Sequence, residues 1–303
     1  MNYKLLIGIA IVLTTFYALT NYTFNKVVNE AKNSRIRASQ ADPLEKYLKD
    51  DVELVSKDNL KLRGTYIPYL RKTAEAEKTI ILIHGYTATS ESMADLITPF
   101  LSHGWNVLLI DQRGHGKSEG QYASFGYHEK GDLDLWVNWV RDRSEKKHQV
   151  IGLLGISMGA GTVLEYAGIN KHVNFIIADC PYSDLEKLLK YQIREIRNIP
   201  AYPLINALDL MLRIRVDFNI KAVSPLKTVR ESEIPIMFIH GSEDRFVPTQ
   251  MSKDLYAIKK GKKKLLIVEG ASHANSYWTN KNLYEKEVWD FIDEVLTTVT
   301  YPD

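Results

Sequence analysis

The chain has 303 residues, of which 45% are hydrophobic and 25% are charged, as in ordinary globular proteins. Its formal net charge of +2 argues against nucleic-acid binding as the main role, and its single cysteine, Cys180, excludes an internal disulfide. The length suits one α/β domain with an insertion. Cys180 follows an apolar run that reads as the end of a strand, so we expect a buried, inert thiol.

The first elements are an uncharged stretch, Leu5 to Phe24, and a polar segment. About twenty residues at 1.5 Å each make a helix of roughly 30 Å, the thickness of a bilayer core. We therefore predict an N-terminal anchor over residues 1–25, which makes the protein membrane-associated. A cleaved signal peptide on a secreted protein comes second, because Ala18-Leu19-Thr20 lacks the A-x-A pattern. A soluble helix packed on the domain comes third.

Basic residues flank this stretch on both sides, with more of them on its C-terminal side. The positive-inside rule would then argue against export of the domain, so the sequence leaves the orientation open. Residues 26–50 are predicted to be a polar, helical linker. The globular domain is expected to occupy residues 51–303.

From this point strands alternate with helices. A hairpin is predicted over 52–67, and further strands over 79–83, 105–110, 149–154, 173–178, 236–239 and 265–268. The predicted helices are 93–101, 127–143, 160–167, 250–258 and 284–299. Continuous apolar runs such as Thr79 to Ile83 are typical of strands that are covered on both faces. The alternation predicts an α/β fold with a mostly parallel sheet and helices on both faces.

Residues 183–223 interrupt this alternation. Ser183 and Glu186 have the spacing of a capping box, and leucines at helical spacing follow until Pro200. A second helix is predicted over 204–214. Two helices between strands predict a small helical lid, and the alternative is packing helices with no gating role. Arginines among the apolar lid residues would admit anionic as well as apolar acyl groups: Arg194, Arg197, Arg213 and Arg215.

The pentapeptide Gly155-Ile156-Ser157-Met158-Gly159 reads G-x-S-x-G between an apolar strand and a helix of small residues. This is the context of a nucleophile elbow, in which the turn strains the serine and the glycines let strand and helix approach. The backbone N–H of Met158 starts the helix and points at the same place. The pentapeptide alone is a weak signal, so the interpretation depends on an acid and a histidine elsewhere.

Asp244 and His273 each follow a later predicted strand. The carboxyl ends of parallel strands lie along one edge of a sheet, so these side chains are expected to meet Ser157 there. The order Ser, Asp, His is the one expected for this fold. Asp244 has an alternative role as a cap for the helix near Thr249.

Other residues compete for these roles. Asp179 and Asp184 are the alternative acids, and His115 is the alternative base. We expect His115 to belong to a structural loop network, together with Asp111 and Arg113. His84 and His240 end apolar strands and are expected to be hydrogen-bonded structural histidines.

These motifs resemble the α/β-hydrolase superfamily over residues 51–299, and most of all its bacterial esterase and serine-aminopeptidase-like branch. The matching segments are 82–86, 111–118, the elbow, and His240-Gly241 with Asp244 and Pro248. The resemblance implies that Ser157 is the nucleophile, His273 the base and Asp244 its orienting acid. The backbone N–H groups of Tyr86 and Met158 would form the oxyanion hole.

The functional hypothesis is a serine hydrolase that cleaves carboxylic esters of small or medium substrates through an acyl-serine intermediate. The alternatives are a peptidase or amidase acting on short peptides or aminoacyl amides, and a non-catalytic membrane-associated binding protein. No cofactor is expected, and no H-x-x-H or paired-carboxylate spacing suggests a metal. The expected partner is a small acyl substrate; the sequence does not indicate an oligomeric state.

A run of lysines, Lys259 to Lys264 around Gly261, lies between a predicted helix and the last predicted strand. Such a position is at the edge of the sheet opposite the predicted site. We expect a solvated turn, and the alternative is contact with anionic lipid headgroups.

Overall fold

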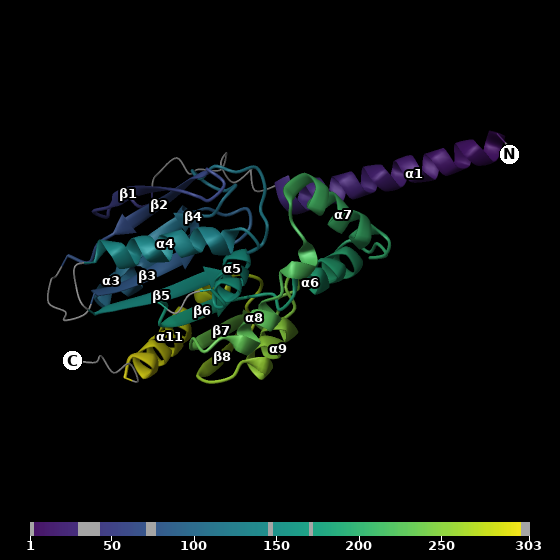
Figure 1. Cartoon of the computed structure of the whole chain (residues 1–303). Helices are drawn as coiled ribbons and strands as arrows, with labels where there is room; N and C mark the ends of the chain where they lie inside the picture. Colours follow the sequence, from purple (N-terminus) through teal and green to yellow (C-terminus); the bar gives the residue numbers. More distant parts are fainter. Residues whose placement is uncertain (1–2, 30–42, 71–76, 145–147, 170–171, 298–303) are drawn as a thin grey trace.

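A computed structural model describes residues 3–29, 43–70, 77–144, 148–169 and 172–297. A single eight-stranded sheet with the order β1-β2-β4-β3-β5-β6-β7-β8 forms its centre (Figure 1). The strands are β1 (Asp50–Val55), β2 (Lys61–Ile67), β3 (Glu77–Ile83), β4 (Asn106–Asp111), β5 (Gln149–Ile156), β6 (Phe175–Asp179), β7 (Ile236–Gly241) and β8 (Lys263–Val268). β2 runs antiparallel to β1 and β4, whereas the other neighbours are parallel. The predicted fold class is confirmed.

Helices cover both faces of the sheet (Figure 1). They are α3 (Ile97–Ser102), α4 (Glu129–Arg143), α5 (Met158–Tyr166), α8 (Pro225–Glu231), α9 (Gln250–Ile258), α10 (Ser276–Thr279) and α11 (Lys281–Leu296). Alternate residues of β3 enter two different cores: Ile80 packs with α3 and α11, and Ile81 packs with α4 and α5. Each fully buried aliphatic side chain contributes about 1.5–3 kcal/mol, which explains why the central strands are apolar throughout.

Several predicted helices differ in their starts: α5 begins at Met158 instead of residue 160, and α11 at Lys281 instead of residue 284. The helix predicted from residue 93 is a 3-10 helix, η2 (Ser90–Leu96), that leads into the short α3. α4 begins at Glu129 instead of residue 127, because the Glu129 carboxylate accepts hydrogen bonds from the backbone N–H groups of Ser124 (2.7 Å) and Gly126 (2.8 Å). These bonds hold a turn in front of the helix.

The insertion between β6 and β7 contains α6 (Leu185–Tyr191), the π-helix η3 (Gln192–Ile196), α7 (Leu204–Val216) and the 3-10 turn η4 (Ile220–Ala222). Its apolar side chains form a third core over the end of the sheet. The predicted capping box is wrong, because Asp184 caps α6 by accepting from the backbone N–H of Lys187 (3.0 Å). Ser183 is buried one residue earlier, and its hydroxyl bonds to no described residue.

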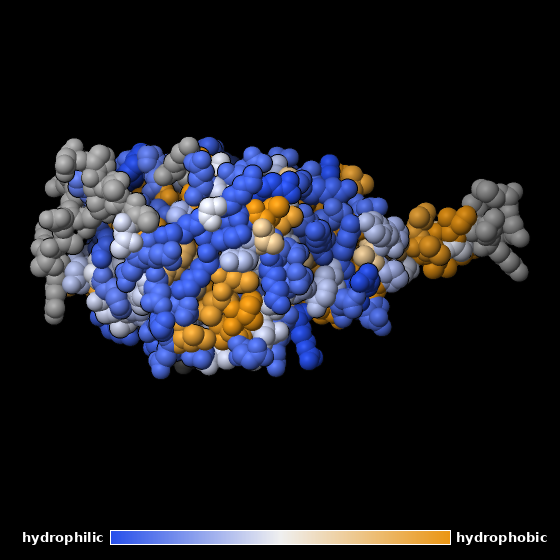
Figure 2. All heavy atoms as spheres, turned by 90° about the horizontal axis from the view of Figure 1, so that it is seen from below, coloured by the Kyte–Doolittle hydropathy of each residue, from blue (hydrophilic) through white to orange (hydrophobic). Residues whose placement is uncertain are grey.

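The chain begins with α1 (Tyr3–Phe24) and the π-helix η1 (Asn25–Asn29). Within the described residues, one helical stretch, Ile7–Val27, is long and apolar enough to cross a membrane by length and composition. Figure 1 shows α1 projecting from the body beside α7, and Figure 2 shows its projecting part as hydrophobic against a mostly hydrophilic body.

The predicted linker over 26–50 lies largely outside the described residues, since nothing is described for 30–42. Its first residues belong to η1, and its described end is a turn instead of a helix. The turn is fixed because the Leu44 side chain packs into the core beside α3 and α11.

Candidate active site

Ser157 stands at the turn between β5 and α5 with φ 57° and ψ −112°. Such a conformation costs about 1–3 kcal/mol in a residue other than glycine and persists only where the surroundings impose it. A Cβ atom on Gly155 would lie 2.3 Å from the carbonyl oxygen of Gly159. A Cβ atom on Gly159 would lie 2.2 Å from the carbonyl oxygen of Ile83. The two glycines therefore permit the close approach of strand and helix that holds Ser157 in this turn.

Three side chains from distant parts of the chain meet at this turn. The Oγ of Ser157 lies 2.8 Å from Nε2 of His273, and Nδ1 of His273 lies 2.6 Å from Oδ2 of Asp244. Asp244 and His273 lie in the loops after β7 and β8, at the same edge of the sheet as Ser157. With a proton on Nδ1, the imidazole donates to the carboxylate and accepts from the hydroxyl, which is the arrangement that activates a serine.

The Asp244 carboxylate is buried and fixed by its own loop. Its Oδ1 accepts from the backbone N–H groups of Phe246 (2.9 Å) and Val247 (2.8 Å), and His240 Nε2 lies 3.1 Å from Oδ2. Burial by itself raises the pKa of Asp244, but the hydrogen bonds from His240 and His273 outweigh it and hold this pKa below its usual range. The carboxylate is thus ionised, and its bonds precede α9, so it does not cap that helix.

The alternative acids have other partners. Asp179, at the end of β6, is buried and accepts from the hydroxyl of Ser276 (3.1 Å); burial raises its pKa to about 6. Asp184 caps α6. Among the described residues, Asp244 is the acid whose carboxylate receives the Nδ1 hydrogen bond of His273.

His115 and His84 belong to the scaffold, as predicted. His115 Nδ1 bonds to the carbonyl of Arg113 (2.9 Å), and its ring packs edge-on against His84. Arg113 in turn binds Asp132 at 2.6 Å. His84 Nδ1 lies 2.7 Å from the carbonyl of the next residue, and burial lowers the pKa of His84, which keeps it neutral.

The Ser157 and His273 side chains line a cavity of about 550 Å³. Its walls come from the loop after β3, the insertion between β6 and β7, the Asp244 loop, and the end of α1 with η1. The remaining lining residues are Thr23, Lys26, Val27, Tyr86, Thr87, Phe125, Met158, Tyr182, Leu188, Leu189, Gln192, Ile193, Arg197, Phe246 and Val247. Tyr86 and Met158, whose backbone N–H groups are the predicted oxyanion donors, thus lie at the serine. The N-terminal residues were not expected here, because an apolar leader gives no sequence signal for contact with a distant pocket.

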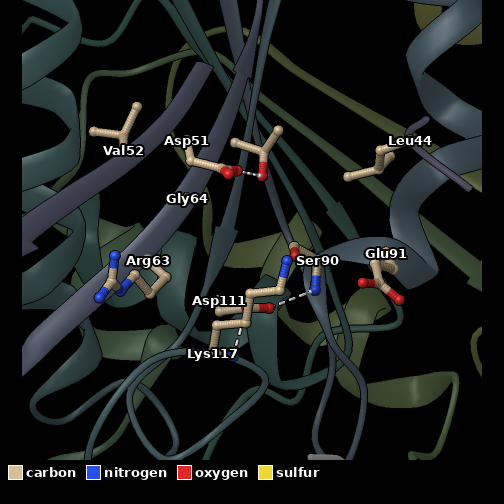
Figure 3. A pocket seen from close by; sticks show the side chains of 10 residues that line it. Leu44, Asp51, Val52, Arg63, Gly64, Ser90, Glu91, Asp111 and Lys117 are labelled. Carbon is tan, nitrogen blue, oxygen red and sulfur yellow. Dashed lines mark hydrogen bonds between the residues drawn. The ribbon is translucent and has the colours of Figure 1, made fainter. Parts of the chain in front are cut away.

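A second cavity, of about 280 Å³, lies between β1, β2 and η2 (Figure 3). Its central carboxylate, Asp111, accepts from the backbone N–H groups of Ser90 (2.7 Å) and Lys117 (2.8 Å). Thr65 donates to Asp51 across it, with 3.5 Å between the oxygens. The two bonds of Asp111 hold the loop after β4 in place, in agreement with the structural role predicted for Asp111.

The Sγ of Cys180, a carboxylate oxygen of Asp244 and a ring nitrogen of His273 lie within 4.8 Å of one another. A metal would need a thiolate and free ligand atoms. Burial raises the pKa of the Cys180 thiol well above its usual value, and His273 and Asp244 already share a hydrogen bond. This donor set therefore fits a triad with a buried neutral thiol beside it better than a metal centre.

The lysine run near residue 260 is in part the solvated turn that was expected, since Lys260 and Gly261 at its tip are exposed. Lys259 is only 1% exposed, and its Nζ donates to the carbonyl of Ser232 (3.0 Å). Lys264 pairs with Glu287 at 2.8 Å. The prediction is wrong for Lys259, because a lysine stem can be buried when backbone carbonyls receive its ammonium group.

Comparison with known proteins agrees with this geometry. The family model described as "Serine aminopeptidase, S33" matches residues 74–222. The uncharacterized protein YqkD of Bacillus subtilis is 37% identical over 223 residues, 73% of each chain, and the uncharacterized protein YfhR of Escherichia coli K12 is 27% identical over 247 residues, 80% of each. Among solved structures, the esterase Pf2001 of Pyrococcus furiosus superposes with a TM-score of 0.69 at 26% identity, covering 86% of this chain and 98% of that one.

Proposed function

Because the chain belongs to the α/β-hydrolase superfamily, we propose that it is a serine hydrolase that cleaves carboxylic esters of small or medium substrates. The observation that carries the proposal is the continuous hydrogen-bonded series from Ser157 through His273 to the buried Asp244, which opens onto a cavity with mostly apolar walls. The likeness to the esterase Pf2001 supports the same substrate class.

In the proposed reaction, Ser157 Oγ attacks the carbonyl carbon of the ester while its proton passes to Nε2 of His273. The carbonyl oxygen becomes an oxyanion, which the backbone N–H groups of Tyr86 and Met158 stabilise. The C–O bond to the alcohol breaks as His273 returns the proton to the leaving oxygen. Water then repeats the sequence on the acyl-serine and releases the carboxylic acid. Asp244 holds the imidazole in the required tautomer and stabilises its protonated form.

The alternative of a peptidase acting on aminoacyl substrates is favoured by the description of the matching family model. An aminopeptidase must bind a protonated α-amino group, for which a nearby carboxylate is the natural partner. The described residues that line the cavity include Lys26 and Arg197 but neither aspartate nor glutamate. This charge distribution supports acyl esters over aminoacyl amides.

A fluorophosphonate probe, which reacts with activated serines, tests the proposal. The wild type is expected to be labelled and Ser157→Ala to be unlabelled. Ser92→Ala, which replaces an exposed serine distant in sequence from the turn, is the control and is expected to be labelled like the wild type. Equal labelling of Ser157→Ala would refute the assignment, and an unlabelled wild type would favour the non-catalytic binding protein. Rates on short acyl esters and on aminoacyl anilides then separate esterase from peptidase.

We also propose that α1 anchors the protein in a membrane, in either orientation. Ile11 and Leu13 are 60% and 62% exposed on α1, away from the lid. The double variant Ile11→Lys, Leu13→Lys is expected to move the protein from the membrane fraction to the soluble fraction. Wild-type protein found in the soluble fraction would contradict the anchor and leave the secreted or soluble alternatives.

A further inference from the structure

The end of α1 and the start of η1 form part of the wall of the cavity that contains Ser157. Thr23, Lys26 and Val27 line it together with the reactive side chains. Phe24, between them, is 2% exposed and belongs to the core of the lid, with Leu188. The end of α1 with η1 is thus packed against the domain as part of the site.

Specific contacts hold this segment in place. Arg215, on α7, donates to the side-chain oxygens of Asn21 (2.8 Å) and Tyr17 (3.2 Å). Its guanidinium also lies 5.0 Å from the centre of the Phe24 ring. On the other side of the cavity, the Tyr86 hydroxyl donates to the carbonyl of Lys26 (3.2 Å). The contacts join α1 to the lid and to the loop that carries a proposed oxyanion donor.

The part of α1 from Ile7 to Leu13 is apolar and exposed, with Val12 at 67%. Next to it, α7 exposes Leu210 and Ile214, beside the exposed Arg213 and Arg215. The stretch Ile7–Val27 has 21 residues, and at 1.5 Å per residue it spans about 30 Å, one bilayer core. The residues that line the cavity are the last ones of this stretch. Thr20, Thr23 and Phe24 are buried against the protein, so the part of the stretch before them is the part that can insert. The cavity then lies at the bilayer surface.

From these contacts we propose that the end of α1 with η1 forms the acyl-binding wall of the site, and that the substrates are amphiphilic acyl esters that enter from the lipid bilayer in which α1 is anchored. The proposal rests on the proposed ester hydrolysis and adds to it the source and class of the substrate. It makes Val27 a specificity-determining residue, because it lines the cavity from the membrane-anchored segment.

The first test measures the ratio of kcat/KM for 4-nitrophenyl octanoate to that for the acetate. Val27→Trp narrows the cavity and is expected to lower this ratio at least about tenfold, since single methylene-sized changes in a pocket are worth about 10–200-fold. Val12→Trp, on the exposed part of the same helix, is the matched control and keeps the wild-type ratio. Partial loss of folded protein lowers both rates by the same factor and cannot by itself change their ratio. The ratio therefore reports on the folded molecules, and an unchanged ratio in Val27→Trp overturns the proposal.

The second test uses wild-type full-length protein in vesicles. 4-Methylumbelliferyl palmitate is placed either in the vesicles that carry the enzyme or in separate ones. Each buried CH₂ of its chain favours the membrane, and a control with labelled separate vesicles measures how fast the ester exchanges. We expect hydrolysis at least about tenfold faster in the shared vesicles, and equal rates would overturn entry from the bilayer. The soluble acetate ester reports on catalysis itself. Failure to hydrolyse the acetate would contradict the proposed function. Hydrolysis of the acetate, with equal palmitate rates in shared and separate vesicles, would contradict only the entry of substrate from the bilayer.

Discussion

The backbone N–H of Ser157 donates a hydrogen bond to the carbonyl oxygen of Asp179, 2.8 Å away. The strained turn is therefore tied to the end of the neighbouring strand β6, and the side chain of the same aspartate is buried at the hydroxyl of Ser276. The residue that supports the serine is also a titrating group in the core.

Replacing Asp179 by asparagine is expected to make stability less dependent on pH. Burial raises the pKa of Asp179 from 3.8 to about 6, so the folded state binds a proton more tightly than the unfolded state. The stabilisation that comes from this tighter proton binding by Asp179 is complete below pH 4 and is lost as the pH rises through 6. The shift of about two pKa units corresponds to about 3 kcal/mol of unfolding free energy. Relative to the wild type, Asp179→Asn should gain up to this amount between pH 4 and pH 7.5, measured by urea unfolding.

Asp290→Asn is the matched control, with the opposite sign. The Asp290 carboxylate is exposed, and its hydrogen bond with Lys286 lowers its pKa. Its stabilising contribution is present above the unfolded pKa and is lost on acidification, so this variant should lose a little relative to the wild type as the pH rises. A pH-independent difference for Asp179→Asn would show that its carboxyl is not protonated on folding.

Asp244→Asn is expected to leave the fold intact and to reduce kcat for short esters by about 10³–10⁴, because asparagine can stabilise the wrong imidazole tautomer. Circular dichroism checks the fold and steady-state kinetics check the rate. Glu243→Gln, at the exposed neighbouring position, should keep wild-type kcat. A loss of less than tenfold in Asp244→Asn would point to a different orienting acid.

Gly159→Ala is expected to lower the free energy of unfolding by about 1–3 kcal/mol, the usual cost of overpacking. The new Cβ would lie 2.2 Å from the carbonyl oxygen of Ile83 and push α5 away from β3. Gly131→Ala in α4 is the control, since nothing lies within 4 Å of its Cβ position; it should stabilise by about 0.5–1 kcal/mol. Denaturant unfolding of both variants measures the contrast, and equal effects would mean that the elbow has room to adjust.

Arg113→Ala is expected to cost about 3–5 kcal/mol of unfolding free energy, because it leaves a buried carboxylate without its partner. Arg113 and Asp132 have side chains that are 9% and 8% exposed and pair at 2.6 Å. Arg63→Ala breaks an exposed pair with Glu53 and should cost less than about 1 kcal/mol. Thermal unfolding compares the two, and a small loss in Arg113→Ala would mean that water reaches Asp132.

The sequence predicted the alternation of strands and helices well, because buried runs such as Ile80 to Ile83 have few other stable arrangements. It also predicted which side chains meet Ser157, since strand ends in a parallel sheet share one edge. Lys259 was misjudged, because its burial depends on the carbonyl of Ser232, which is distant in the sequence. Val27, on η1, was missed for a similar reason. The apolar pattern of residues 5–24 predicts a membrane-spanning segment and contains no information about a contact with the insertion between β6 and β7.

The tight fit of Gly155 and Gly159 against their neighbours has a consequence for how this enzyme can change. Because the backbone beneath Ser157 is closely packed, substitutions there would change the position of the serine. New substrate preferences must then arise in the segments that line the cavity, namely α6 with η3, the loop at Phe246, and the end of α1 with η1. In directed evolution toward new acyl groups, successful substitutions should accumulate in those three segments and not in β5, the turn at Ser157 or α5.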